Sequence, residues 1–169
     1  MVSLILVFMV ALAEQLAILD SPFTCQTTVR FSPKGGVEEL LVKEIGQAKA
    51  RIRIAIYGLN NPKVADALIA AGQKGVDIAL KLDRVQSAGK NQQLQIERLR
   101  GAGIRVEVSQ RSRLLHNKFM VLDGKRVWTG SYNWTTQAED RHRENVVLLD
   151  CPEAAELYEK EWAVIEIGK

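Results

Sequence analysis

Residues 114–134 contain a short apolar run and a second expected strand joined by a tight turn, and this arrangement predicts a β-hairpin. The apolar run covers residues 119–122 and the second strand covers residues 126–129. Between them lies Asp123-Gly124, a dipeptide that favours two-residue turns between antiparallel strands. We therefore expect the chain to fold back on itself here, so that the two outer ends of the hairpin meet at one end of a sheet.

Four polar side chains lie at those outer ends. His116 and Lys118 precede the first strand, and Ser131 and Asn133 follow the second. Side chains two apart share a face of a strand, so each pair is expected to point one way. An imidazole can act as a nucleophile near neutral pH, while the other three groups are hydrogen-bond donors that suit a phosphoryl group. Neither a carboxylate between 116 and 122 nor a second His or Cys at metal-ligand spacing accompanies them, so we expect metal-free chemistry.

The rest of the chain alternates apolar strand patterns with helical patterns. This alternation predicts an α/β layer fold with helices on both faces of the sheet. The carboxyl ends of strands commonly carry the site in such folds. A length of 169 residues favours one domain. The expected strands cover 27–31, 51–57, 76–82, 104–108 and 145–149, and the expected helices cover 37–48, 61–75, 91–100 and 152–162.

The N-terminal segment has the features of a secretory signal peptide. Its apolar run is too short to span a bilayer and ends in Ala11-Leu12-Ala13, a small-x-small cleavage pattern. We expect residues 1–13 to be removed, with cleavage there or a few residues later, and residues 20–169 to form a single catalytic domain. The alternatives are a buried N-terminal helix and an uncleaved anchor. Export would place the protein in the periplasm or outside the cell.

The two cysteines, Cys25 and Cys151, bear on the same question. In an exported protein they can form one disulfide between the segment before the first strand and the start of the last helix. Two unrelated buried thiols are the alternative, and the sequence does not decide between them.

The pattern His116-x-Lys118-x4-Asp123, followed by Gly130-Ser131-x-Asn133, resembles the HKD motif of the phospholipase D superfamily. The resemblance extends from about residue 29 to 162 and includes Phe31-Ser32-Pro33, Gly75-Val76-Asp77 and Glu144-Asn145. Most enzymes of that superfamily carry two copies of the motif. A chain with one copy and an apolar leader is similar to the bacterial Nuc-type endonucleases. The resemblance implies a mixed, mostly parallel sheet sandwiched between helices.

The resemblance also implies roles for the motif residues. His116 would attack phosphorus and form a phosphohistidine, and Lys118 would hold the phosphoryl oxygens. Ser131 and Asn133 would complete the phosphate pocket. The family's matching glutamate, here Glu144, would orient the catalytic histidine.

Asp123 is the aspartate of the HKD motif, but we interpret it as structural because it lies in the hairpin turn beside Gly124.

A second histidine is needed to protonate the leaving oxygen, and this chain has only two. His142 lies in Arg141-His142-Arg143 without matching companions, and we interpret it as a solvated loop residue. The resemblance therefore implies a symmetric homodimer in which two copies of His116 face each other.

Positive charge is concentrated around the motif, although the net charge is only +3. Such cations are expected to attract phosphodiester backbones at the mouth of the site. The flanking cations are Arg111, Arg113, Lys125, Arg126, Arg141 and Arg143. We take Arg111, Arg113 and Arg143 as substrate-binding residues. Tyr132 and Trp134 are candidates for stacking on bases, with Trp134 better explained as a core residue.

The sequence thus predicts a metal-independent phosphodiesterase without cofactors, most consistent with a nonspecific endonuclease that acts on DNA and also on RNA. Its expected partners are nucleic acid and a second copy of itself, with no stable membrane association after processing. Three alternatives remain: a phospholipase D-type lipid phosphodiesterase, a membrane-anchored single-motif relative that keeps residues 1–19, and a catalytically dead nucleic-acid-binding module.

Overall fold

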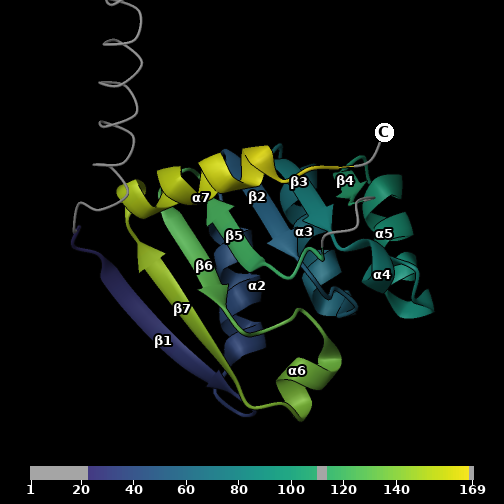
Figure 1. Ribbon diagram of the computed structural model, residues 1–169, viewed down its shortest axis with the longest axis horizontal. Helices are drawn as coiled ribbons and strands as arrows, with labels where there is room; N and C mark the ends of the chain where they lie inside the picture. The colour runs from purple at the N-terminus through teal and green to yellow at the C-terminus, as the bar shows by residue number, and fades with distance from the viewer. Residues whose placement is uncertain (1–22, 110–113, 168–169) are drawn as a thin grey trace, which may run out of the picture.

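The computed structural model describes residues 23–109 and 114–167. The predicted signal peptide and the two arginines Arg111 and Arg113 lie outside these ranges. Within them, no helix combines the length and the hydrophobicity that crossing a bilayer requires. The described chain is built on one seven-stranded sheet with the order β1-β7-β6-β5-β2-β3-β4 (Figure 1). The strands are β1 (Gln26–Ser32), β2 (Arg51–Ile56), β3 (Asp77–Leu82), β4 (Arg105–Val108), β5 (Lys118–Leu122), β6 (Arg126–Gly130) and β7 (Glu144–Asp150).

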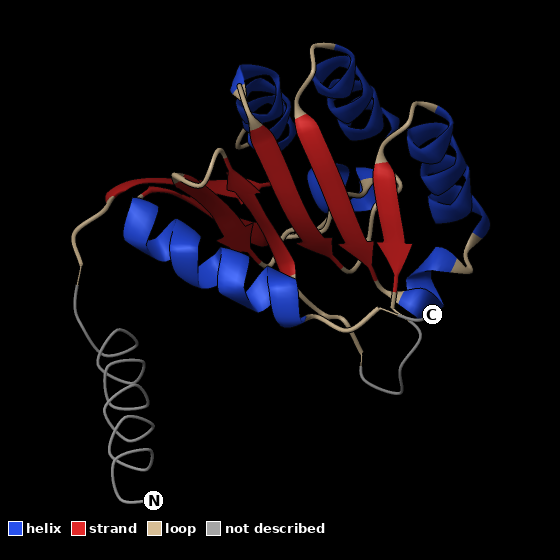
Figure 2. Ribbon diagram, turned by 90° about the horizontal axis from the view of Figure 1, so that it is seen from above, coloured by secondary structure: helices blue, strands red, loops and turns tan. Residues whose placement is uncertain are grey.

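Helices cover both faces of this sheet, as the alternating pattern predicts. The helices α2 (Val37–Gln47), α3 (Pro62–Gln73) and α5 (Lys90–Gly101) pack on one face of the sheet, and α7 (Pro152–Val164) packs on the other (Figure 2). Successive side chains of β5 divide between the two layers: Met120 and Leu122 pack with the three helices, and Phe119 and Val121 pack beneath α7. These four helices are long, and the short ones are α4 (Arg84–Ser87) and α6 (Thr136–Asp140).

The sheet is mixed and lies between helices, which confirms the expected architecture, but its pairing is not mostly parallel. Only the β2–β3 and β3–β4 pairs are parallel. The pairs β1–β7, β7–β6, β6–β5 and β5–β2 are antiparallel. Parallel neighbours need a long crossover, which α3 and α5 supply, whereas a tight turn and the short α6 segment join β5, β6 and β7.

The Asp123-Gly124 turn closes the predicted hairpin between β5 and β6. Both residues have positive φ, 55° and 64°, and Lys125 donates its N–H to the carbonyl of Leu122 at 3.0 Å across the turn. Leu122 pairs with Arg126, so the connection has three residues instead of the predicted two. The Asp123 carboxylate accepts backbone N–H bonds from Lys49, Ala50 and Arg51, at the start of β2. Burial alone would raise the pKa of Asp123, but these N–H groups lower it below its usual value. Asp123 therefore fastens the turn to the neighbouring strand.

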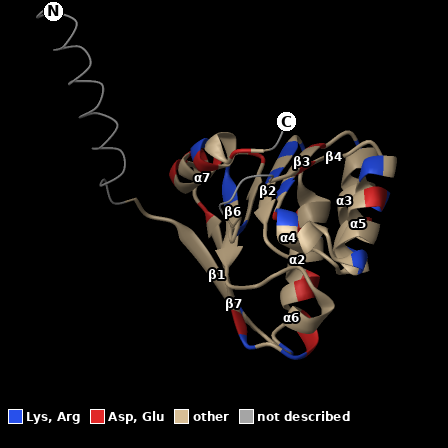
Figure 3. Cartoon of the chain, turned by 45° about the vertical axis from the view of Figure 1, so that its right-hand side comes forward, with Lys and Arg blue, Asp and Glu red and all other residues tan. Residues whose placement is uncertain are grey.

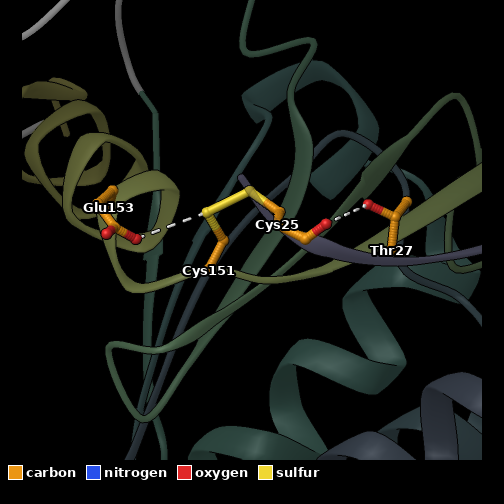
Figure 4. The surroundings of a disulfide bond; sticks show 4 residues. All are labelled: Cys25, Thr27, Cys151 and Glu153. Carbon is orange, nitrogen blue, oxygen red and sulfur yellow. Dashed lines mark hydrogen bonds between the residues drawn. A yellow bond between two sulfur atoms is a disulfide. The ribbon is translucent and has the colours of Figure 1, made fainter. Parts of the chain in front are cut away.

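The two cysteines form a disulfide between residues 126 apart in the chain (Figure 4). Cys25 lies just before β1, and Cys151 is the N-cap of α7. The bond ties the start of the edge strand β1 to the start of α7 (Pro152–Val164), at the end of the sheet where Gln26 pairs with Asp150. Of the two alternatives left open by the sequence, the structure has the bonded pair.

Candidate active site

The hairpin ends meet other strand ends at one edge of the sheet. β2, β3 and β6 end at this edge, and β5 and β7 begin there (Figure 1). Ile56 is paired with Lys118, and Phe119 with Thr129. The residues that follow β6 therefore lie beside the residues that precede β5, as the hairpin pattern predicts.

His116 lies in the segment before β5, not within the strand, and its side chain is exposed. Its imidazole contacts the ring of Tyr57, which directly follows β2. The two ring centroids are 4.7 Å apart with the planes inclined at 60°. The Tyr57 N–H also donates to the carbonyl of Asn117 at 2.9 Å, so this segment is held against the end of β2.

Lys118 is buried, with only 8% of its surface exposed. Its ammonium donates to the carbonyl oxygen of His116 at 2.7 Å and lies 4.9 Å from the centroid of the Tyr57 ring. Burial lowers the pKa of Lys118, and the nearby carboxylates of Glu144 and Asp83 oppose that effect. An ammonium carries three protons, so the contact with His116 leaves two for a ligand.

Ser131 contacts Glu144 rather than standing free. Its hydroxyl donates to the Glu144 carboxylate and accepts the N–H of Asn145 at 3.1 Å. A serine hydroxyl has one proton, so Ser131 has none left to donate to a phosphate while this bond persists. Its immediate effect is to fix the carboxylate at the start of β7.

The role of Glu144 in orienting the catalytic histidine stays a prediction. Among the described contacts, its carboxylate meets Ser131 and lies 3.6 Å from Nδ1 of His142, and none joins it to His116. The reason is the strand order, because β6 separates β7 from β5. Glu144 still acts on the site electrostatically, since it favours the charged form of Lys118.

Asn133 is oriented by a backbone contact. Its side-chain oxygen accepts the N–H of Gly58 at 3.1 Å, and the next residue, Trp134, donates its N–H to the carbonyl of Gly58 at 2.9 Å. These bonds dock the segment after β6 onto the segment after β2. With its oxygen engaged, Asn133 has its NH2 group as the part available to a bound anion.

Asp83 was not singled out from the sequence, although it touches the same segment. It is 1% exposed and directly follows β3. One carboxylate oxygen caps α4 by accepting the N–H groups of Val85 and Gln86, and the other accepts the N–H of Leu115 at 3.2 Å. Tyr57 and Asp83 share one signal that the sequence did contain: each lies at the carboxyl end of a buried strand.

The cations predicted to surround the site are divided between the two ends of the sheet. Lys125 lies in the hairpin turn and Arg126 begins β6, at the end opposite Lys118, and Arg126 pairs with the buried Glu44. They do not line the site, because the turn lies a full strand length away from the outer ends of the hairpin. Arg143 is exposed before β7, where Figure 3 shows basic and acidic segments side by side.

The two aromatic residues after β6 are buried and unable to stack on bases. Tyr132 is 1% exposed and Trp134 is 0% exposed. The Tyr132 hydroxyl donates to Glu139 at 2.8 Å, and burial together with this carboxylate raises its pKa. The core assignment of Trp134 is therefore confirmed, and the stacking role is wrong for both residues.

The assembled groups suit nucleophilic attack on an anion. An exposed imidazole and a buried ammonium lie against the same tyrosine ring, and the Asn133 amide is held by Gly58, the residue after Tyr57. Across the described ranges, no three His, Cys, Asp or Glu side chains gather closely enough to hold a metal ion.

Comparison with known proteins gives one family. The family described as "Cardiolipin synthase, PLD-like domain" matches residues 41–164. A phospholipase D of Rickettsia conorii is 33% identical over 132 residues, which cover 78% of this chain and 65% of that protein. A mitochondrial cardiolipin hydrolase of Xenopus laevis is 34% identical over 123 residues, covering 73% of this chain and 57% of that protein. The chain thus spans less than two thirds of the length of these relatives.

Among solved structures, the crystal structure of Nuc from Salmonella typhimurium, a phospholipase D family member, superimposes with a TM-score of 0.81. The two sequences are 27% identical, and the match covers 86% of this chain and 99% of Nuc. NucT from Helicobacter pylori has the same fold, with a TM-score of 0.75 at 18% identity.

Proposed function

This chain belongs to the phospholipase D superfamily, and on that premise we propose that it is a metal-independent phosphodiesterase with His116 as its nucleophile. One observation carries the proposal: an exposed imidazole and a buried ammonium lie against the same tyrosine ring. The imidazole is accessible to a substrate, and the ammonium is held in place beside it.

The proposed reaction has two steps. The imidazole of His116 forms a bond to phosphorus while the bond to the leaving oxygen breaks, and that oxygen takes a proton from an acid. Water then attacks the phosphohistidine, and the imidazole leaves. Lys118 and the NH2 group of Asn133 stabilise the charge that builds on the phosphoryl oxygens. The hydroxyl of Ser131 acts indirectly: it holds the carboxylate of Glu144, which favours the charged form of Lys118.

The leaving oxygen needs a proton donor besides the nucleophile. We place His116 of a second copy in this role, which makes the enzyme a symmetric homodimer with one shared site. His142 is the only other histidine of the sequence, and it lies in an exposed loop with its Nδ1 3.6 Å from the Glu144 carboxylate.

Nucleic acid is the substrate class that we favour, with nonspecific endonucleolytic cleavage of DNA and RNA. The match to Nuc supports this choice because it extends over nearly the whole of that chain. Arg143 and its neighbour Arg141 are exposed at the site edge, where backbone phosphates of any sequence would be attracted. Arg111 and Arg113 remain predicted contributors.

A lipid phosphodiester is the second candidate substrate. Leu114, two residues before His116, is 57% exposed, and an apolar side chain at the mouth of a site favours contact with acyl chains. The relatives named phospholipase D and cardiolipin hydrolase point the same way.

A substrate panel in excess EDTA tests the proposal, with the chain lacking residues 1–13. Wild type is expected to cleave plasmid DNA, and His116→Ala is expected to be inactive. Hydrolysis of phosphatidylcholine or cardiolipin vesicles without DNA or RNA cleavage would select the lipid substrate. Cleavage that needs a divalent cation, or that survives in His116→Ala, would contradict the proposed chemistry.

We also propose that the protein is exported to the periplasm or beyond. The disulfide between Cys25 and Cys151 supports this location, since such bonds persist in oxidising compartments. Fractionation of cells that express the full chain, with N-terminal sequencing of the product, tests both the location and the cleavage near residue 13.

A further inference from the structure

One aromatic ring contacts both principal groups of the site. The ring of Tyr57 has its centroid 4.7 Å from that of the His116 imidazole and 4.9 Å from Nζ of Lys118. Its backbone N–H binds the carbonyl of Asn117, the residue between those two. Tyr57 thus touches three consecutive positions of the segment that carries the nucleophile.

Tyr57 is itself held from three sides. It directly follows β2, whose last residue is paired with Lys118. Its hydroxyl accepts a hydrogen bond from Nε2 of Gln86 at 2.8 Å, and its carbonyl accepts a longer one from Nε2 of Gln92 at 3.5 Å. Gln92 is buried and also accepts the N–H of Leu59 at 2.7 Å. The ring is therefore a fixed surface, anchored to the sheet and to α4 and α5.

We propose that Tyr57 is a positioning residue, which holds the imidazole of His116 in its attacking orientation and the ammonium of Lys118 beside it. The inference deepens the proposed function and rests on it. His116 is exposed and lies outside the strand, so its own backbone does not fix its side chain. A ring packed against one side of the imidazole removes orientations that would point the nucleophile away from phosphorus, and small misplacements of a reacting group are costly.

Kinetics of two variants test this role. Tyr57→Leu removes the ring and is expected to lower kcat about 10- to 100-fold. Because Tyr57 is not assigned a substrate contact, KM should change by less than about threefold. Tyr57→Phe keeps the ring and loses only the contact with Gln86, so kcat should stay within about threefold of wild type. Tyr158→Leu is the matched control. Tyr158 belongs to α7 and packs its ring on that of Phe119, with the two centroids 4.9 Å apart. This substitution should leave kcat unchanged.

Histidine NMR gives a readout that does not depend on catalysis. Two histidines are present, so the ring signals are assigned by comparing wild type with His116→Ala. The ring current of Tyr57 should displace the His116 signals; Tyr57→Leu should return them toward free histidine, and Tyr57→Phe should not. If Tyr57→Leu fails to fold by circular dichroism, Tyr57→Met replaces it, since methionine fills space flexibly without a ring.

Two results would overturn the inference: a folded variant without the ring that keeps kcat within threefold of wild type, or His116 signals that do not respond to loss of the ring. A chain that cleaves nothing, or that stays active as His116→Ala, would instead defeat the proposed function, and the NMR comparison would still decide whether Tyr57 fixes the imidazole.

Discussion

Lys118 illustrates at the scale of one residue how this site is built. An ammonium that is only 8% exposed is costly unless it is paired. The protein supplies a carbonyl, an aromatic face and two carboxylates at longer range. Among the described residues none forms a direct ion pair with this ammonium, so its charge is kept next to His116. A phosphoryl group gaining negative charge would be a suitable anionic partner for it.

Replacing Lys118 is therefore expected to affect chemistry more than binding. Lys118→Ala should lower kcat about 10²- to 10³-fold, the range found when one oxyanion-stabilising donor is removed. Lys118→Arg should not restore it, because a planar guanidinium does not fit a site shaped for a compact ammonium. The control is Lys125→Ala at the far end of the hairpin, which should be fully active. An active Lys118→Ala enzyme would contradict the role.

The lowered pKa of Lys118 has a consequence for the pH profile. Burial favours the neutral amine, so the ammonium loses its proton at a lower pH than free lysine, whose pKa is about 10.4. Activity should be present below the pKa of the buried group and fall as the pH rises through it. A kcat profile measured from pH 6 to 10.5 checks this, and an alkaline limb at or above the ordinary lysine value would count against it.

The sequence predicted the site residues that belong to the motif, but not the contacts between them. His116 and Lys118 follow from their spacing beside an apolar run. Tyr57 and Asp83 come from strands distant in sequence, and only the packed sheet brings them to residues 115–118. The Ser131–Glu144 bond likewise depends on the order of β5, β6 and β7, which local pattern does not specify.

The hairpin β5–β6 is the element that carries the site, and Asp123 holds its closed end. The carboxylate accepts three backbone N–H bonds from residues 49–51, which exist only when the turn is docked on β2. Asp123→Asn keeps a side chain that tolerates positive φ and removes the charge. It should lower the free energy of unfolding by about 1.5–3 kcal/mol, the usual range for hydrogen bonds to a charged group, and leave kcat nearly unchanged.

The pH dependence of stability should also differ between wild type and Asp123→Asn. The folded pKa of Asp123 is lowered, so its contribution is complete above the unfolded value of about 3.9 and is lost as the pH falls through the folded value. Urea unfolding between pH 2.5 and 7 should show a smaller acid loss in Asp123→Asn than in wild type. A variant with normal stability but little activity would instead make Asp123 part of the chemistry.

Element positions were predictable where the apolar period was long, as for β2, β3, α3 and α5. The directions of the strands were less predictable. The connections between β5, β6 and β7 are short, and short connections join antiparallel strands. The expectation of a mostly parallel sheet came from the family resemblance and underestimated the number of antiparallel pairs.

At the scale of the whole molecule, the proposed chemistry requires two copies. Mixing wild type with a ninefold excess of His116→Ala, under conditions of subunit exchange, should lower the activity per wild-type chain about tenfold, because most wild-type chains then lack an intact partner. The activity should not change if each chain works alone. Lys125→Ala mixed in the same proportion is the control, since its partners keep His116.

The most direct test of the account is to trap the covalent intermediate. A short oligonucleotide is mixed with excess enzyme in EDTA, quenched in alkali to preserve a nitrogen–phosphorus bond, and the protein is digested for mass spectrometry. We predict a phosphoryl adduct on the peptide that contains His116, absent from His116→Ala. Cleavage without any adduct, or with the adduct on another residue, would contradict histidine nucleophilic catalysis at this site.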